Sequence, residues 1–160
     1  LVRDLPAPVD AARRGTLTLV PQPALVATTA EVRALAERAP VATRARPVST
    51  VVADARAVEF YQGTSPGGLP RSGHVPGATN VPLPSLTGAA STLRDTTALR
   101  ARFRAAGIAP RDTVVTYCFV GMQASLLWLQ ARRLGHPARL YDASFTAWSR
   151  DRGLPVVTGP

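Results

Sequence analysis

The sequence contains no lysine, a single cysteine and no long uninterrupted hydrophobic run. With Cys118 alone, the chain cannot form an internal disulfide, so its fold does not depend on an oxidising compartment. No apolar stretch approaches the roughly 18 residues that a membrane-spanning helix needs, so the sequence predicts no membrane span. Charged residues make up only 18% and hydrophobic residues 46%, which excludes disorder throughout the chain. A chain of 160 residues is long enough for one domain with its own core.

All 19 basic residues are arginine, and the formal net charge is +9. The missing lysine is typical of a GC-rich bacterial genome. An excess of basic residues can indicate nucleic-acid binding, but these arginines are scattered along the sequence and are not interleaved with aromatic residues. The exception is the group Arg100, Arg102 and Arg104 on one predicted helix. We therefore expect no nucleic-acid partner and read the charge as long-range attraction for small anions.

The hydrophobic pattern predicts strands that alternate with helices. Short β-branched runs predict strands over 50–54, 78–81, 113–117 and 138–141. Periodicity and capping residues predict helices over 30–38, 57–62, 97–106, 124–134 and 144–150. The segment 64–77 is rich in glycine and proline and is expected to be irregular. Together these elements predict a doubly wound α/β fold, for which we expect a five-stranded, mostly parallel sheet with helices on both faces.

Cys118 is predicted to follow the carboxyl end of a strand, the edge where ligands gather in open α/β sheets. A lone thiol is either an inert packing residue or a reactive nucleophile. Six residues, 118–123, separate the predicted strand from the next helix, and Gly121 can adopt backbone conformations closed to other residues. A loop this short points N–H groups inward, beside the free N–H groups of the helix start. Because such a cradle stabilises negative charge on sulfur, the pattern favours the reactive thiolate.

Phosphate transfer is one cysteine chemistry that uses a cradle of this kind. A phosphatase needs an arginine at the end of the loop to clamp the phosphate oxygens. That position holds Ala124 in this chain, and the nearest downstream arginine is Arg132. The loop is also one residue too short for a phosphate. The sequence therefore disfavours a phosphatase or an arsenate reductase.

Four motifs are spread over most of the chain. They are Asp54-Ala55-Arg56 with the following 59–63, the segment 72–82 (SGHVPGATNVP), the loop 118–125, and the closing segments 141–148 and 153–156. Together they resemble the rhodanese family, and specifically the C-terminal catalytic domain of a tandem-domain bacterial thiosulfate sulfurtransferase. The segment 72–82 is close to the family signature and is highly specific. The resemblance implies a rhodanese-like fold over residues 25–160.

The same resemblance implies sulfur transfer through a persulfide on Cys118. The thiolate would accept sulfane sulfur from a small anionic donor, with thiosulfate expected, and pass it to cyanide or a thiol. One alternative is a 3-mercaptopyruvate sulfurtransferase. Another is a persulfide carrier or sulfide-sensing binding module that turns over poorly. No metal or organic cofactor is implied.

Supporting residues also take their expected roles from the resemblance. Arg56 would either hold an anionic donor or form a buried pair with Asp54 or Glu59, and both interpretations stay open. Asp54 would fix the geometry of its loop. His74 would pin the signature segment through its imidazole.

The loop after Cys118 departs from the family pattern. Thiosulfate-using rhodaneses often carry basic residues directly after the cysteine, and mercaptopyruvate enzymes carry small ones, whereas this loop has neither. The expected substrate-binding residues are Arg56, Arg71 and the loop residues Phe119, Val120, Gly121, Met122 and Gln123. Backbone amides and the two arginines would then recognise the anion. The apolar loop favours a bulkier or less charged partner, or a protein that carries the persulfide.

The first residues, 1–24, are rich in proline, arginine and small residues. They resemble the end and linker of a preceding rhodanese domain, which would make such a domain a partner of this one. The compartment stays open. One reduced cysteine suits the cytoplasm, whereas an export signal that had been removed would place the protein in the periplasm.

Overall fold

The computed structural model describes residues 15–38 and 49–160, so the first 14 residues of the predicted linker lie outside it. The strands are β1 (Thr50–Asp54), β2 (Thr79–Asn80), β3 (Thr113–Tyr117) and β4 (Ala138–Leu140). The helices are α1 (Thr29–Arg38), α2 (Val58–Gln62), α3 (Thr96–Ala105), α4 (Met122–Arg133) and α5 (Ser144–Arg150). Three 3₁₀ helices are η1 (Pro23–Leu25), η3 (Leu83–Ser85) and η4 (Ala89–Ser91). Within the described ranges, no helix has both the length and the apolar character needed to cross a membrane.

The strands form one parallel sheet in the order β2-β1-β3-β4, which confirms the predicted α/β class. We predicted five strands, and the described residues form four. The free edge of β4 carries only a single parallel bridge, from Val26 to Leu140, where the N–H of Ala27 donates to the Leu140 carbonyl at 2.9 Å. Pairing stops there because η1 precedes Val26 and α1 begins three residues later.

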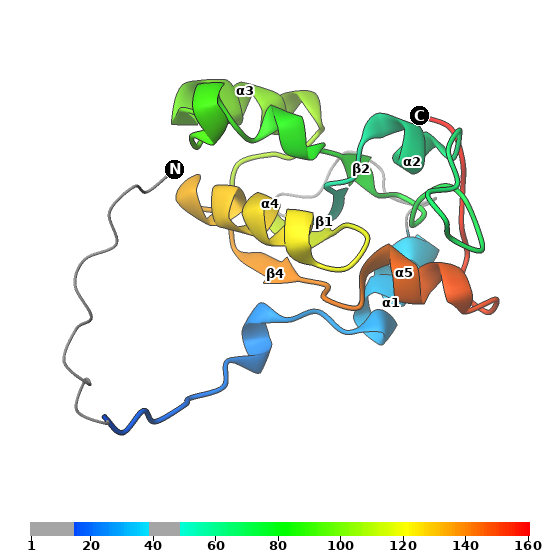
Figure 1. Ribbon diagram of the computed structural model, residues 1–160, viewed down its shortest axis with the longest axis horizontal. Helices are drawn as coiled ribbons and strands as arrows, with labels where there is room; N and C mark the ends of the chain where they lie inside the picture. The colour runs from blue at the N-terminus through cyan, green and yellow to red at the C-terminus, as the bar shows by residue number, and fades with distance from the viewer. Residues whose placement is uncertain (1–14, 39–48) are drawn as a thin grey trace, which may run out of the picture.

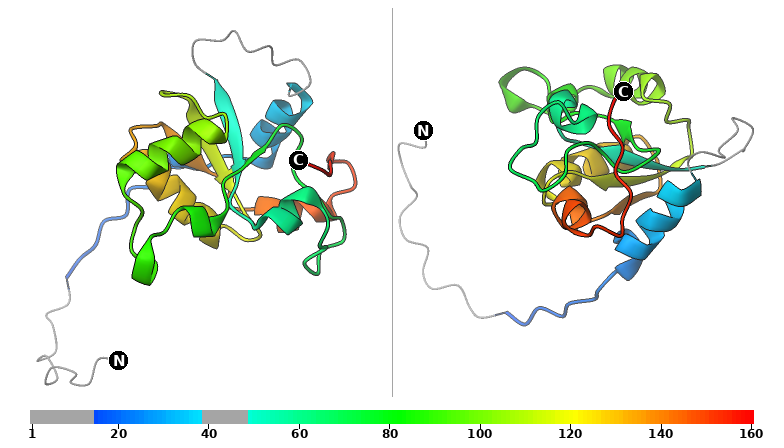
Figure 2. Two further views of the ribbon diagram at one scale, coloured as in Figure 1. Left: turned by 90° about the horizontal axis from the view of Figure 1, so that it is seen from above. Right: turned by 90° about the vertical axis from the view of Figure 1, so that its right-hand side faces the viewer.

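Helices cover both faces of the sheet (Figures 1 and 2). The helices α3 and α4 pack on one face, where Leu99, Phe103 and Leu127 are fully buried. The helices α1 and α5 pack on the other face around the buried Trp148. Two clusters of apolar side chains therefore enclose the sheet, as a parallel sheet requires.

The side chains of β3 point alternately to the two faces of the sheet, so this strand contributes residues to both apolar clusters. Val114 and Cys118 belong to the cluster under α4, and Val115 and Tyr117 belong to the cluster under α5. Successive side chains of a strand point to opposite faces. The same alternation places the Cys118 side chain on the α4 face, at the carboxyl end of a strand that has a neighbour on each side.

Local signals fix several helix ends as predicted. The capping box at α1 is present, since the Thr28 N–H donates to the Glu31 carboxylate at 2.7 Å and the Glu31 N–H donates to the Thr28 hydroxyl at 3.3 Å. Gly63 ends α2 in the left-handed conformation, with a φ of 81°. The sequence did not predict the cap of α3, where the Asp95 carboxylate accepts two backbone N–H groups.

The C-terminal segment closes over the signature segment through a close backbone approach at Gly73. The neighbouring His74 pairs with Val157 in an antiparallel bridge, with N–H to carbonyl distances of 2.8 and 3.1 Å. Gly73 has a φ of 115°, and a Cβ placed there would collide with the Val157 carbonyl. Only glycine therefore fits beneath this strand-like segment.

We predict that Gly73→Ala lowers the free energy of unfolding by about 2–5 kcal/mol, because positive-φ strain and steric overlap add. Gly68→Ala is the matched control, since Gly68 also has a positive φ (74°) but has nothing within 4 Å of an added Cβ. It should cost only about 1–2 kcal/mol. Urea unfolding of both variants measures the difference, and equal losses would contradict the close approach.

Candidate active site

Cys118 lies immediately after β3 and is the sole cysteine of the chain. Its side chain is buried, with 1% of the residue exposed. Four residues, 118–121, separate β3 from α4, so the prediction of a six-residue connection was wrong. Met122 and Gln123, which favour helix, form the first turn of α4 instead. Gly121 makes the turn possible with a φ of 89°.

The carbonyl groups of the loop are held by the start of α5. The Cys118 carbonyl accepts the Phe145 N–H at 2.9 Å, and the Phe119 carbonyl accepts the Thr146 N–H at 3.1 Å. The Cys118 N–H donates to the Ser144 hydroxyl oxygen at 3.3 Å, and that hydroxyl donates to the Tyr141 carbonyl at 2.9 Å. These bonds fix which way the loop backbone faces.

Unlike the carbonyl groups, most N–H groups of the loop make no hydrogen bond within the described part of the chain. From Phe119 to Ala124, six consecutive backbone N–H groups find no hydrogen-bond acceptor among the described residues. The first intrahelical bond of α4 comes only at Ser125, whose N–H donates to the Gly121 carbonyl at 2.9 Å. Free N–H groups of a curled loop and a helix start form a site that favours negative charge. The backbone expected around Cys118 is therefore available to an anion.

The side chains of the loop form an apolar rim around this backbone. The rings of Phe119 and Phe60 meet edge to face with centroids 5.0 Å apart. Val120 is 58% exposed and Met122 is 78% exposed. Gln123 is half-buried, and its side-chain oxygen is buried without a partner in the described part of the chain. The rim thus offers hydrocarbon, and the charge-binding capacity of the loop lies in its backbone.

Arg56 and Asp54 form a buried ion pair at the end of β1. The guanidinium Nη2 lies 2.6 Å from Asp54 Oδ2, and Nε lies 3.0 Å from both carboxylate oxygens. Nη2 also donates to the Gly73 carbonyl at 2.7 Å. Burial lowers the pKa of Arg56, but the hydrogen bonds and charge of Asp54 outweigh it, so the pKa rises. Of the two interpretations left open for Arg56, the geometry supports the buried pair.

Comparisons with known proteins match these features. The family model described as a rhodanese-like domain matches residues 28–151. The chain belongs to the rhodanese family. A putative thiosulfate sulfurtransferase of Synechococcus elongatus is 37% identical in an alignment of 101 residues that covers 56% of this chain and 31% of the relative. The sulfur carrier protein TtuD of Thermus thermophilus is 33% identical over 94 residues, 58% of this chain and 33% of the relative.

Solved structures show the same rhodanese fold at lower identity. A probable thiosulfate sulfurtransferase superposes with a TM-score of 0.63 at 24% identity, covering 89% of this chain and 52% of that one. The anaerobic ergothioneine biosynthesis enzyme of Chlorobium limicola superposes with a TM-score of 0.73 at 21% identity, covering 86% and 33%. The chain spans about one third of the length of the curated relatives named above.

Arg71 lies outside the cysteine loop. Its guanidinium donates to four carbonyls at the end of α5 and in the closing segment, those of Trp148, Ser149, Asp151 and Leu154. Nε, Nη1 and Nη2 are all engaged, and cations at a helix C-terminus are stabilising. The structure therefore gives Arg71 a structural role in holding the rhodanese closing motif, and it offers no support for the predicted contact with substrate.

His74 is buried in the signature segment, as its predicted pinning role requires. Its Nδ1 lies 2.8 Å from the Tyr61 carbonyl, and since a carbonyl only accepts, Nδ1 carries the hydrogen. The imidazole also stacks on the Tyr61 ring, with centroids 3.8 Å apart and planes 13° from parallel. Burial lowers the pKa of His74 below its ordinary value. The ring is accordingly a neutral packing and hydrogen-bonding group.

Two residues of the site had no clear signal in the sequence. Ser144 contacts the Cys118 backbone directly and adopts a φ of 55°, which is strained for a residue with a side chain. Phe60 was noted within a motif but not as a neighbour of Phe119. Gly67 allows this contact, because a Cβ there would lie 3.0 Å from Phe60 and 3.1 Å from Phe119.

We predict that Arg56→Met lowers the free energy of unfolding by about 3–5 kcal/mol, because it leaves the Asp54 carboxylate buried without its counter-charge. The double variant Asp54→Leu/Arg56→Met should lose less than the sum of the two single variants, since an apolar pair carries no unpaired charge. Urea unfolding of all four proteins completes the cycle. Additive losses would show that the two side chains are not coupled.

A second prediction concerns pH. The pKa of His74 is lower in the folded than in the unfolded chain, so unfolding takes up a proton below the ordinary value of 6.5. Stability that is present above this pH is lost as the pH falls toward the lower folded pKa, by at most about 1.4 kcal/mol per pH unit. In His74→Asn this contribution to the slope should vanish. Urea unfolding at several pH values between 5 and 8 tests it, and an unchanged slope would assign the dependence to other groups.

Proposed function

We propose that this rhodanese domain is a thiosulfate sulfurtransferase that works through a persulfide on Cys118. The observation that carries the proposal is the run of six N–H groups, from Phe119 to Ala124, that have no acceptor in the described part of the chain and directly follow the single buried thiol. Such donors stabilise a thiolate, and they stabilise a persulfide anion through the same contacts. The names of several relatives, including a putative thiosulfate sulfurtransferase, agree with this assignment.

The proposed reaction has two transfers. The Cys118 thiolate attacks the outer sulfur of thiosulfate, a sulfur–sulfur bond forms to the enzyme, and sulfite leaves with the electron pair of the bond that breaks. Cyanide or a thiolate then attacks the terminal sulfur of the persulfide. Thiocyanate or a new persulfide leaves, and the Cys118 thiolate is restored. With 3-mercaptopyruvate as donor, a carbon–sulfur bond would break in the first transfer instead.

A persulfide carrier is the second candidate, and the apolar rim favours it. The exposed Val120 and Met122 suit contact with another protein better than contact with a small anion. Arg56 and Arg71, expected to bind the donor, are engaged by Asp54 and by backbone carbonyls. One relative is named a sulfur carrier protein. Such a carrier would form the persulfide but pass it slowly to small acceptors.

The organisation of the whole protein is also a proposal. We infer that residues 25–160 form the rhodanese domain and that residues 1–24 link it to a preceding rhodanese domain. The match covers only about one third of each of these curated relatives, which is compatible with this arrangement. The mass of the natural protein, compared with that of this chain, tests it.

We predict that thiosulfate adds one sulfur atom to the wild-type chain, and that cyanide removes it. Intact-mass spectrometry after separate incubation with thiosulfate and with 3-mercaptopyruvate measures the gain and ranks the donors. Cys118→Ser should gain no sulfur from either. The catalytic proposal fails if neither donor modifies a free Cys118 thiol in the wild-type chain.

Steady-state turnover distinguishes the two candidate functions. A sulfurtransferase produces thiocyanate continuously from thiosulfate and cyanide, whereas a carrier gives about one equivalent of transferred sulfur and then slows. Met122→Gln is a useful companion variant, since Met122 is exposed and a polar side chain there should leave folding unchanged. If the rim contacts a protein acceptor, this variant should weaken transfer to that acceptor more than it weakens persulfide formation from thiosulfate.

A further inference from the structure

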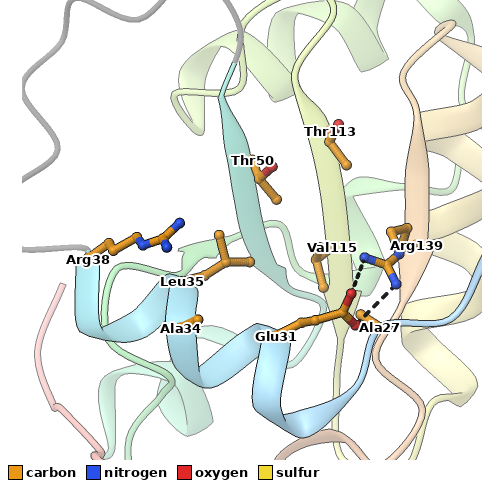
Figure 3. A pocket seen from close by; sticks show the side chains of 9 residues that line it. All are labelled: Ala27, Glu31, Ala34, Leu35, Arg38, Thr50, Thr113, Val115 and Arg139. Carbon is orange, nitrogen blue, oxygen red and sulfur yellow. Dashed lines mark hydrogen bonds and ion pairs between the residues drawn. The ribbon is translucent and has the colours of Figure 1, made fainter. Parts of the chain in front are cut away.

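A cavity lies at the opposite end of the sheet from Cys118. It has a volume of about 250 Å³ and opens between α1 and the strands (Figure 3). Thr50 and Thr113, the first residues of β1 and β3, mark its position at the amino edge. Cys118 follows the other end of β3, five residues further on, which is roughly 17 Å along an extended strand. The cavity is therefore separate from the cysteine loop.

The floor of this cavity is hydrocarbon. Leu35 and Ala34 of α1 face the sheet, and Val115 of β3 lies opposite them, as Figure 3 shows. Ala27 completes the apolar lining. Because Ala34 of α1 and Ala27, which precedes the helix, are both small, they leave space above the strand that larger residues would fill. Small pockets with an apolar floor and few polar groups are suited to a small-molecule ligand.

The charged groups at the rim leave one positive charge unbalanced. Arg139 and Glu31 neutralise each other, with Nη1 to Oε1 at 2.9 Å and Nη2 to Oε2 at 3.1 Å. This contact with Arg139, and hydrogen bonds from Thr28, lower the pKa of Glu31 to about 2, so its carboxylate is ionised. Arg38 lines the same cavity and forms no ion pair within the described residues. Its neighbour Glu37 is paired with Arg33 at 2.7 Å.

We propose that this cavity binds a small amphipathic anion, with its carboxylate at Arg38 and a short hydrocarbon body over Leu35 and Val115. The residues that line the cavity determine both the charged and the hydrocarbon part of the ligand. The apolar floor disfavours a fully polar anion, and the Arg38 guanidinium, which is unpaired among the described residues, disfavours a cation. The volume corresponds to about eight water molecules, which limits the ligand to a short chain. This inference is independent of the reaction proposed for Cys118.

Titration with octanoate tests the proposal, with methyl chemical shifts of the ¹³C-labelled full chain as the readout. Shifts should saturate at Leu35, Ala34 and Val115. Arg38→Gln should raise the dissociation constant about two- to fivefold, the range for an exposed ion pair. Octylamine, with the same chain and the opposite charge, should bind more weakly than octanoate.

A filled cavity provides the decisive comparison. Ala34→Phe places a ring in the space and should abolish the octanoate shifts, whereas Ala30→Phe, on an exposed position of the same helix that does not line the cavity, should preserve them. Cys118→Ser should bind octanoate as the wild type does. The proposal is overturned if octanoate causes no saturable shifts, if the shifts survive Ala34→Phe, or if octylamine binds as tightly as octanoate.

Discussion

The ion pair between Asp54 and Arg56 lies at the meeting point of the segments that build the cysteine site. It follows β1, reaches the signature segment through the Gly73 carbonyl, and places the guanidinium carbon 3.9 Å from the centre of the Phe145 ring. The same carbon lies 5.3 Å from the ring of Phe119, the residue after Cys118. Arg56 is 1% exposed. A buried charge is tolerated only when its partners are all in place, so this pair requires the correct positions of the signature segment, the loop and α5 at once.

The N-termini of α5 and α4 differ in what their backbone N–H groups bind near Cys118. The first N–H groups of α5 bind the carbonyls of Cys118 and Phe119. The loop backbone is thereby turned so that the N–H groups from Phe119 to Ala124 have no acceptor among residues 15–38 and 49–160. Buried or partly buried N–H groups are rarely left unpaired without a reason. The proposed function supplies such a reason, because bonds made within the protein would compete with a bound anion.

The sequence allowed prediction of the parts of this arrangement that depend on local patterns. The bounds of β1, β3 and α5 agree with the prediction, since each is a short apolar or periodic run between turn residues. The start of α4 was misplaced by two residues, because the helix propensity of Met122 and Gln123 is a weak signal and helix ends are uncertain by one or two residues in a sequence.

Roles that depend on contacts distant in sequence were harder to predict. Arg71 binds carbonyls nearly 80 residues away, and nothing near it in the sequence distinguishes that role from binding of an anion. The contact of Ser144 with the Cys118 N–H spans 26 residues and depends on how α5 packs. The pairing of Arg56 with Asp54 was one of two open alternatives, and burial in the folded chain supports one over the other.

Because Arg56 and Arg71 bind other groups of the protein, different parts of the molecule would attract an anion at long range and bind it at the cysteine loop. The net charge of +9 attracts anions, but salt screens it over about 8 Å at physiological ionic strength. In the proposed reaction, the anion would meet backbone N–H groups that hydrogen bonds to α5 already hold in place, so binding would need little reorganisation. The side chains of Phe119, Val120 and Met122 add hydrocarbon but no charge beside these donors, and Val120 and Met122 stay exposed. The residues that depart from the family pattern therefore leave the backbone N–H groups as the donors that the proposed function depends on.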